Sequence, residues 1–142
     1  MGAAELRPVE PTPGEIQYLE DRIYEFNSTA TGIADGEWLA LLLRNESGRI
    51  VAGICGNTWG GACEIRQFWV EASKRHRGLG TKLYGAAERE ARKRGCTQIL
   101  LMTFSFQALP FYERNGFEVL ATIDDHPRGH RNYLMRKQLT RV

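Results

Sequence analysis

The sequence predicts a mixed α/β fold in one domain, and three observations support this fold class. The chain has 142 residues, a length that suits a single hydrophobic core. Hydrophobic residues make up 42% and charged residues 25%, which excludes collagen, coiled coils and wholesale disorder. Segments with helical periodicity alternate with short apolar segments bounded by turn residues. We therefore expect residues 1–142 to form one domain.

The first predicted element is an amphipathic helix from about Gly14 to Asn27. Its apolar residues recur at steps of three and four, which places them on one helical face. They are Ile16, Leu19, Ile23 and Phe26. The opposite face is acidic.

Three strands are predicted next, over residues 38–44, 50–58 and 62–70. The tetrad Asn45-Glu46-Ser47-Gly48 separates the first two and is typical of a tight turn, so they should form an antiparallel hairpin. Gly60-Gly61 then turns the chain into the third strand.

The second half of the chain predicts two helices and three strands. A helix opens at Gly78-Leu79-Gly80 and carries an apolar seam, Leu83, Ala87 and Ala91. Gly95 follows basic residues, which predicts the end of this helix. The remaining elements are a strand over 98–103, a helix over 106–115 closed by Gly116, and strands over 117–123 and 133–139.

A basic, glycine-rich loop lies between the strand over 62–70 and the helix after it. The first N–H groups of a helix lack intrahelical partners and favour anions, and glycines let the main chain approach a ligand closely. Two known phosphate motifs do not fit, because Leu83 stands where a dinucleotide motif needs glycine and Thr81-Lys82 is in the wrong order for a Walker A loop. The loop still predicts an anion pocket.

Two motifs resemble the GNAT superfamily of N-acetyltransferases. Arg75-x-x-Gly78-x-Gly80 is similar to its pyrophosphate loop, and the segment 105–117 resembles its N-x-x-A-x-x-x-Y-x-x-x-G-F signature. The two motifs span about residues 62–123, and the other predicted elements fit the family's topology. The resemblance implies a mostly antiparallel sheet of six to seven strands, splayed at the cofactor strand and flanked by helices. It also implies an enzyme that transfers acetyl from acetyl-CoA to a primary amine by direct attack in a ternary complex.

The resemblance also implies the residues that hold acetyl-CoA. The main chain of the loop would bind the phosphates, and the end of the third strand would pair with the pantetheine arm. Ser105 replaces the asparagine of the signature, which puts that residue's usual hydrogen bond to the arm in question. The implied cofactor-binding residues are Phe68, Trp69, Val70, Arg75, His76, Arg77, Gly78, Leu79, Gly80, Thr81 and Ser105.

The implied chemistry assigns two catalytic side chains and one main-chain group. Tyr112 falls on the family tyrosine that protonates the departing thiolate. Glu64 is the candidate base for the amine, on a strand face expected to include Arg66 and Phe68, with a water relay as the alternative. The Val70 N–H is the expected donor to the thioester oxygen.

The acceptor is expected to be a small-molecule amine, with Asp124 and Asp125 rimming its pocket and favouring a cation. His126 and His130 lie in a loop with Pro127 and Gly129, so no metal is expected there. Neither nucleic acid nor membrane is expected as a partner, the cytoplasm is the expected compartment, and a homodimer is possible. Two other functions remain open: a non-catalytic acyl-CoA sensor and, less favoured, a single-stranded nucleic-acid-binding module.

Overall fold

The computed structural model describes residues 5–139, and its contacts form two units, residues 1–34 and 35–142. The first unit contains α1 (Pro13–Thr31). Its start is closed by a capping box, because the Thr12 hydroxyl accepts from the Glu15 N–H and the Glu15 carboxylate accepts from the Thr12 N–H. The predicted helix is confirmed but is longer at its end, where Gly32 takes a left-handed conformation. Its apolar stripe is exposed.

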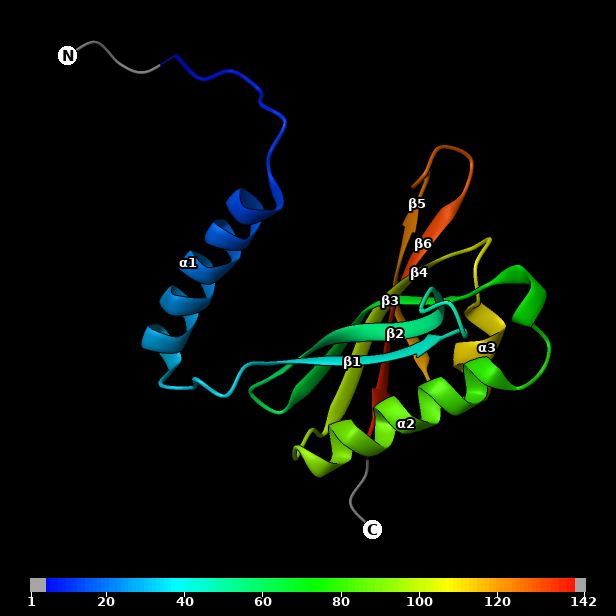
Figure 1. Cartoon of the computed structure of the whole chain (residues 1–142). Coiled ribbons are helices and arrows are strands. Elements are labelled where there is room, and N and C mark those ends of the chain that lie inside the picture. Colours follow the sequence, from blue (N-terminus) through cyan, green and yellow to red (C-terminus); the bar gives the residue numbers. More distant parts are fainter. Residues whose placement is uncertain (1–4, 140–142) are drawn as a thin grey trace. The chain divides into compact units, whose positions relative to one another are not determined.

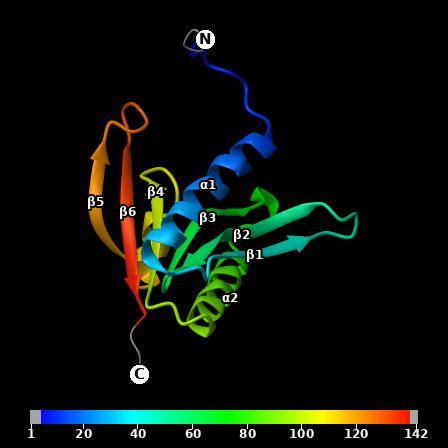
Figure 2. The same cartoon turned by 90° about the vertical axis from the view of Figure 1, so that its left-hand side faces the viewer.

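The second unit is built on a six-stranded sheet (Figures 1 and 2). The strand order is β1-β2-β3-β4-β6-β5, and only the β3–β4 pair is parallel. The family topology expected from the sequence is therefore confirmed, with six strands. The strands are β1 (Glu37–Arg44), β2 (Ile50–Trp59), β3 (Ala62–Val70), β4 (Gln98–Phe104), β5 (Glu118–Asp124) and β6 (Arg131–Gln138).

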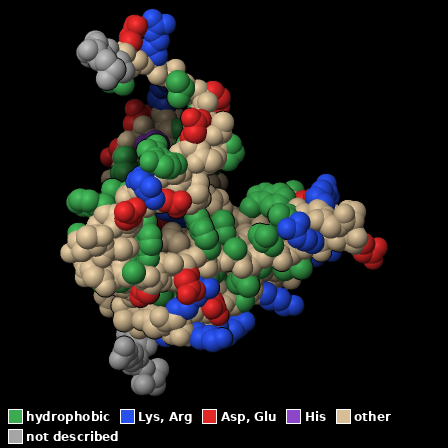
Figure 3. Space-filling view, turned by 60° about the vertical axis from the view of Figure 1, so that its left-hand side comes forward, with side chains coloured by type: hydrophobic (Ala, Val, Ile, Leu, Met, Phe, Trp, Pro, Cys, Tyr) green, Lys and Arg blue, Asp and Glu red, His purple; other side chains and the backbone are tan. Residues whose placement is uncertain are grey.

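The β1–β2 hairpin forms as predicted, and its turn is organised by one side chain. The Asn45 carboxamide oxygen accepts hydrogen bonds from the N–H groups of Ser47 and Arg49 and from the Ser47 hydroxyl. Hydrophobic side chains reach the surface around this hairpin, beside charged ones (Figure 3). Of the hairpin's large apolar residues, Leu42 and Ile50 are exposed.

Two helices, α2 (Leu79–Lys93) and α3 (Leu109–Arg114), pack with one face of the sheet in a single hydrophobic core. The predicted seam of α2 is buried. Gly95 and Gly116 take positive φ, as predicted for residues that end helices. The predicted helix over 106–115 is wrong at its start, because a turn closed by the Gln107 N–H bonding to the Phe104 carbonyl precedes α3.

β3 and β4 pair only at their beginnings. The parallel pairing ends at Ile65 and Leu101, after which the two strands diverge. A bulge interrupts the β2–β3 ladder at the same level, because Cys55 pairs with Gln67 whereas Gly56 pairs with Ile65. Arg66 is the extra residue. This is the splay expected at the cofactor strand.

The bulge corrects the predicted face of Glu64. Glu64 pairs with Asn57, whereas Phe68 pairs with the buried Ile54 and packs against the core. Directly opposed residues lie on one face, so Glu64 and Phe68 lie on opposite faces. The extra residue reverses the alternation that an uninterrupted strand would have kept.

No helix within residues 5–139 has the length and apolar character needed to cross a bilayer.

Candidate active site

A cavity of about 830 Å³ opens where β3 and β4 diverge. Its wall combines the end of β3, the loop to α2, the start of α2, the end of β4 and α3, so distant parts of the sequence meet there. The size suits a small-molecule ligand. Ten of the site residues predicted from the sequence line this cavity: Phe68, Trp69, Val70, Arg75, His76, Gly78, Leu79, Gly80, Thr81 and Tyr112.

The α2 N-terminus forms one end of this cavity and is not closed by a side chain. Gly78 is its N-cap, in a left-handed conformation with φ 77°, and the helix begins with the Lys82 N–H bonding to the Gly78 carbonyl. In contrast to Thr12 of α1, glycine offers no side-chain acceptor for the first N–H groups of the helix. Lys74 and Arg75 supply positive charge beside these groups.

The end of β3 directs main-chain groups toward the gap. The Glu71 N–H bonds to the Val51 carbonyl at 2.8 Å, which makes Ala52 and Val70 a non-hydrogen-bonded pair of the antiparallel ladder. The N–H and C=O of Val70 therefore point away from β2, toward the side where β4 has separated. Phe68 lies two residues earlier and shares this orientation. The Val70 carbonyl accepts a hydrogen bond from Arg75 Nε at 2.8 Å.

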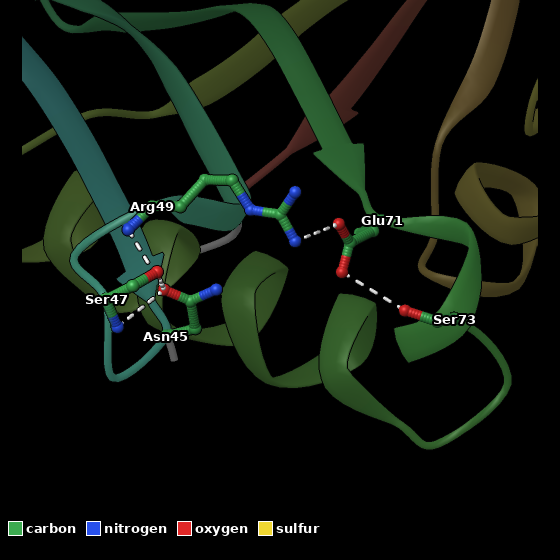
Figure 4. A network of polar contacts seen from close by, with 5 residues as sticks. All are labelled: Asn45, Ser47, Arg49, Glu71 and Ser73. Atoms are coloured by element: carbon green, nitrogen blue, oxygen red, sulfur yellow. Dashed lines mark hydrogen bonds and ion pairs between the residues drawn. The ribbon is translucent and has the colours of Figure 1, made fainter.

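A polar network anchors the loop that follows β3 (Figure 4). Arg49 directly precedes β2. Its guanidinium donates to the Glu71 carboxylate at 3.0 Å. The other oxygen of that carboxylate accepts from the Ser73 hydroxyl at 3.1 Å. Asn45 fixes the Arg49 main chain in turn. The β1–β2 turn thus holds the first residues of the basic loop.

Tyr112 is buried but still reaches the cavity. Its ring packs edge-on against Phe68, Phe111 and Phe117. Burial raises the pKa of the phenol from 10.0 to about 12. The hydroxyl therefore carries its proton throughout the neutral pH range.

Gln107 is a cavity residue that the sequence prediction missed. Its carboxamide oxygen accepts from the Phe104 N–H at 2.9 Å and from the Thr103 hydroxyl at 3.3 Å. Two acceptor contacts on the oxygen fix the amide, which leaves its NH2 group as a donor. Ser105 stands where the family motif carries asparagine. The sequence signal for Gln107 was that its side-chain amide lies only two residues after this position.

Ser105 does not line the cavity, and its hydroxyl accepts from the Arg131 N–H at 3.1 Å. It therefore bonds to the start of β6.

Four other predicted site residues are not among those that line the cavity. Arg77 is exposed. The Glu64 carboxylate lies 3.9 Å from Arg66 Nε, with its side chain about half exposed. Asp124 pairs with Arg131 at 3.1 Å, and Asp125 accepts from the Gly129 N–H at 2.8 Å. The structure therefore does not bring these carboxylates to the cavity wall.

The three cysteines are free thiols. Cys63 and Cys96 are buried, as expected for packing residues. Burial raises the pKa of Cys63 to about 11, so this thiol is protonated at neutral pH and is a poor nucleophile.

Comparison with known proteins identifies relatives of the chain. Residues 4–117 match the Acetyltransferase (GNAT) family. The blasticidin-S acetyltransferase of Streptomyces morookaense is 36% identical over 95 residues, which cover 66% of this chain and 70% of that protein. The crystal structure of an acetyltransferase from Bacillus cereus is 31% identical, with a TM-score of 0.76 over 94% of this chain and 98% of the other.

A further solved structure shares the fold at lower identity. It is a putative streptothricin acetyltransferase from Bacillus anthracis, solved in complex with acetyl coenzyme A. The two chains are 18% identical with a TM-score of 0.62, over 72% of this chain and 63% of the other.

Proposed function

The chain belongs to the GNAT family of acetyltransferases and is an N-acetyltransferase, and we propose that it transfers the acetyl group of acetyl-CoA to a small-molecule amine by direct attack in a ternary complex. The observation that carries this proposal is the uncapped start of α2 in the same cavity as the free main-chain edge of β3. The first feature suits a diphosphate, and the second suits an extended arm with amide groups.

In this proposal, acetyl-CoA binds along the cavity with its phosphates at the α2 N-terminus. The main chain of residues 75–81 donates to the phosphates, and Lys74 and Arg114 add charge from the cavity wall. The pantetheine arm pairs with residues 68–70 as an added strand, where β4 has separated from β3. The Gln107 amide donates to the arm in place of the asparagine of the family motif.

The acetyl transfer then needs two contributions from the protein, one at the thioester oxygen and one at the sulfur. The amine nitrogen attacks the thioester carbon, and the Val70 N–H stabilises the negative oxygen that forms. The carbon–sulfur bond breaks, and the thiolate takes a proton from the Tyr112 hydroxyl. With its pKa raised by burial, the phenol is protonated at neutral pH and is a weak acid, so it gives up the proton only as negative charge develops on the sulfur.

The proton that the amine loses goes to water in this proposal. Glu64 is half exposed and outside the cavity wall, so it acts as the base only through such a water relay. Asp124, paired with Arg131 of the neighbouring strand β6, and Asp125, bonded within the β5–β6 loop, remain candidates for the outer rim of the acceptor site. The relative from Streptomyces morookaense is a blasticidin-S acetyltransferase, which supports a small-molecule acceptor. The cytoplasm remains the proposed compartment.

The experiment that tests this function measures free thiol released from acetyl-CoA by the wild-type protein with a panel of amines. Release that requires both protein and amine, with the N-acetyl product found by mass spectrometry, is the expected result. Calorimetry measures acetyl-CoA binding in parallel. Binding without release from any amine would instead identify the non-catalytic acyl-CoA sensor.

A further inference from the structure

One side of the cavity carries large apolar side chains that the proposed cofactor contacts do not use. Trp69 of β3 and Met102 of β4 line it and are 48% and 53% exposed. Trp69 alternates with Phe68 and Val70, which pack against the core, and Met102 alternates with the buried Leu101 and Thr103. Both side chains therefore stand on the sheet face opposite α2, one on each of the two strands that diverge.

Phe106 completes this wall from the turn after β4. It lines the cavity and is 57% exposed. Its ring stacks on Phe104 with the centroids 5.4 Å apart and the planes 2° from parallel. The His130 ring contacts it edge-on at 5.1 Å. These contacts hold the ring of Phe106 as a flat aromatic surface in the cavity wall, which offers a stacking platform at low entropic cost.

The charges of the cavity argue against a polycation in the same place. Its lining residues include four cationic side chains and, within the described part of the chain, no carboxylate. The cationic ones are Arg66, Lys74, Arg75 and Arg114. Most of these cations are assigned to the cofactor phosphates above, but no carboxylate of the described lining offers a polyamine an ionic partner, whereas a ring with one amino group would bury apolar area.

We propose that the acceptor of the acetyl group is an amine that carries an aromatic or heteroaromatic ring, which packs on Trp69, Met102 and Phe106. This inference rests on the proposed function and specifies the acceptor of that same site. The amino group projects from the ring into the gap between β3 and β4, toward the thioester.

The test compares amines that differ in one property. The compounds are 2-phenylethylamine, its saturated counterpart 2-cyclohexylethylamine, and spermidine. Calorimetry measures their binding to the protein saturated with CoA, and thiol release from acetyl-CoA measures turnover. We expect 2-phenylethylamine to bind about 5-fold more tightly than the saturated amine, the gain typical of an aromatic contact, and spermidine to bind most weakly.

Variants show whether the side chains of Trp69 and Phe106 cause the preference for the aromatic amine. Trp69→Leu and Phe106→Leu should each remove most of the preference for the aromatic amine, whereas Phe106→Tyr should retain it. Phe106→Leu, outside the proposed cofactor contacts, should leave the acetyl-CoA KM within 2-fold. Trp38→Leu is the matched control, because Trp38 is exposed on the same sheet face but outside the cavity. Circular dichroism confirms that each variant is folded.

The two proposals fail in different ways. Equal or tighter binding of 2-cyclohexylethylamine or spermidine by the wild-type protein overturns the ring-bearing acceptor, even where thiol release proves the transferase activity. An unchanged preference in both leucine variants also overturns it. Ring-selective binding without thiol release from any amine would overturn the transferase and leave the specificity of the wall standing.

Discussion

Arg75 Nε donates a hydrogen bond to the carbonyl oxygen of Val70 at 2.8 Å, across five residues of the chain. The bond ties the basic loop to the strand end whose N–H is proposed to meet the thioester oxygen. Arg75 therefore links the phosphate end of the proposed cofactor site to its reactive end. The remaining guanidinium nitrogens are left to contact phosphate.

Arg75→Lys is predicted to raise the Kd for acetyl-CoA about 10-fold. Lysine keeps the charge, but it lacks the planar guanidinium that can donate to the Val70 carbonyl and to a phosphate at the same time. Isothermal titration calorimetry measures it. Arg77→Lys is the control, since Arg77 lies outside the cavity wall. Equal effects of both changes would show that the loop contributes charge alone.

Gly78→Ala is predicted to weaken acetyl-CoA binding as well as folding. Gly78 has φ 77° with open space around its Cα, so the added methyl is opposed by backbone strain of about 1 kcal/mol. Gly48→Ala, at φ 84° in the β1–β2 turn and equally uncrowded, should lose similar stability. Only Gly78→Ala should raise the Kd for acetyl-CoA. A rise of the same size in Gly48→Ala would refute a local role for Gly78.

Tyr112→Phe is predicted to lower kcat about 100-fold with little change in the Kd for acetyl-CoA, because the lost group is a general acid and the ring remains. Tyr84→Phe is the matched control in the same core. Its hydroxyl bonds to Glu88 at 2.7 Å, away from the cavity wall, so its loss should cost about 1 kcal/mol of stability and leave kcat unchanged. A kcat in Tyr112→Phe close to that of wild type removes the phenol from the mechanism.

Stability is predicted to fall at alkaline pH. The phenol of Tyr112 has a pKa of about 12 in the folded protein, above the ordinary 10.0 expected for the unfolded chain. The unfolded state therefore loses this proton first as the pH rises, and about 3 kcal/mol of stability disappears between pH 10 and 12.

Two further groups act in the same direction. Burial raises the pKa of the Cys63 thiol to about 11, and burial together with the Glu88 carboxylate raises the pKa of Tyr84. Urea unfolding at pH 8, 10 and 11 measures the fall. Tyr112→Phe should show a shallower decline above pH 10 than the wild-type protein, and an identical slope would contradict the raised pKa of this phenol.

Arg49→Met is predicted to raise the Kd for acetyl-CoA about 2-fold, because the Arg49–Glu71 pair is partly exposed and such pairs contribute about 0.5 kcal/mol. Glu71→Gln should do the same, and the double variant should add little to either. Calorimetry at low and high salt measures these values. Glu118→Gln, which breaks a pair of similar length with Arg136, should leave binding unchanged.

Local patterns predicted most of the fold. The turn at Asn45, the seam of α2 and the helix end at Gly95 each depend on residues close in sequence, so periodicity and glycine positions located them. The bulge at Arg66 could not be predicted in this way. A bulge is a register relation between two strands, and it reversed the face assigned to Phe68 relative to Glu64.

Site residues could be assigned from the sequence where a family motif includes them. Contacts between residues far apart in the sequence could not be assigned in this way. Tyr112 and the residues of the 75–81 loop were assigned from the resemblance to the family, and all of them except Arg77 line the cavity. Ser105 was assigned to the cofactor by its place in the motif, but its hydroxyl bonds to Arg131, 26 residues away. The Arg49–Glu71 pair joins residues 22 apart, and nothing local to either one predicts it.

In the proposed cofactor site, the glycine at the head of α2 also links coenzyme supply to the lifetime of the folded protein. A helix whose leading amides are satisfied by a ligand is most stable when that ligand is present. At a coenzyme concentration 100 times its Kd, the folded state gains about 2.7 kcal/mol. When the thioester is scarce, more of the chain will sample unfolded conformations that proteases can cut.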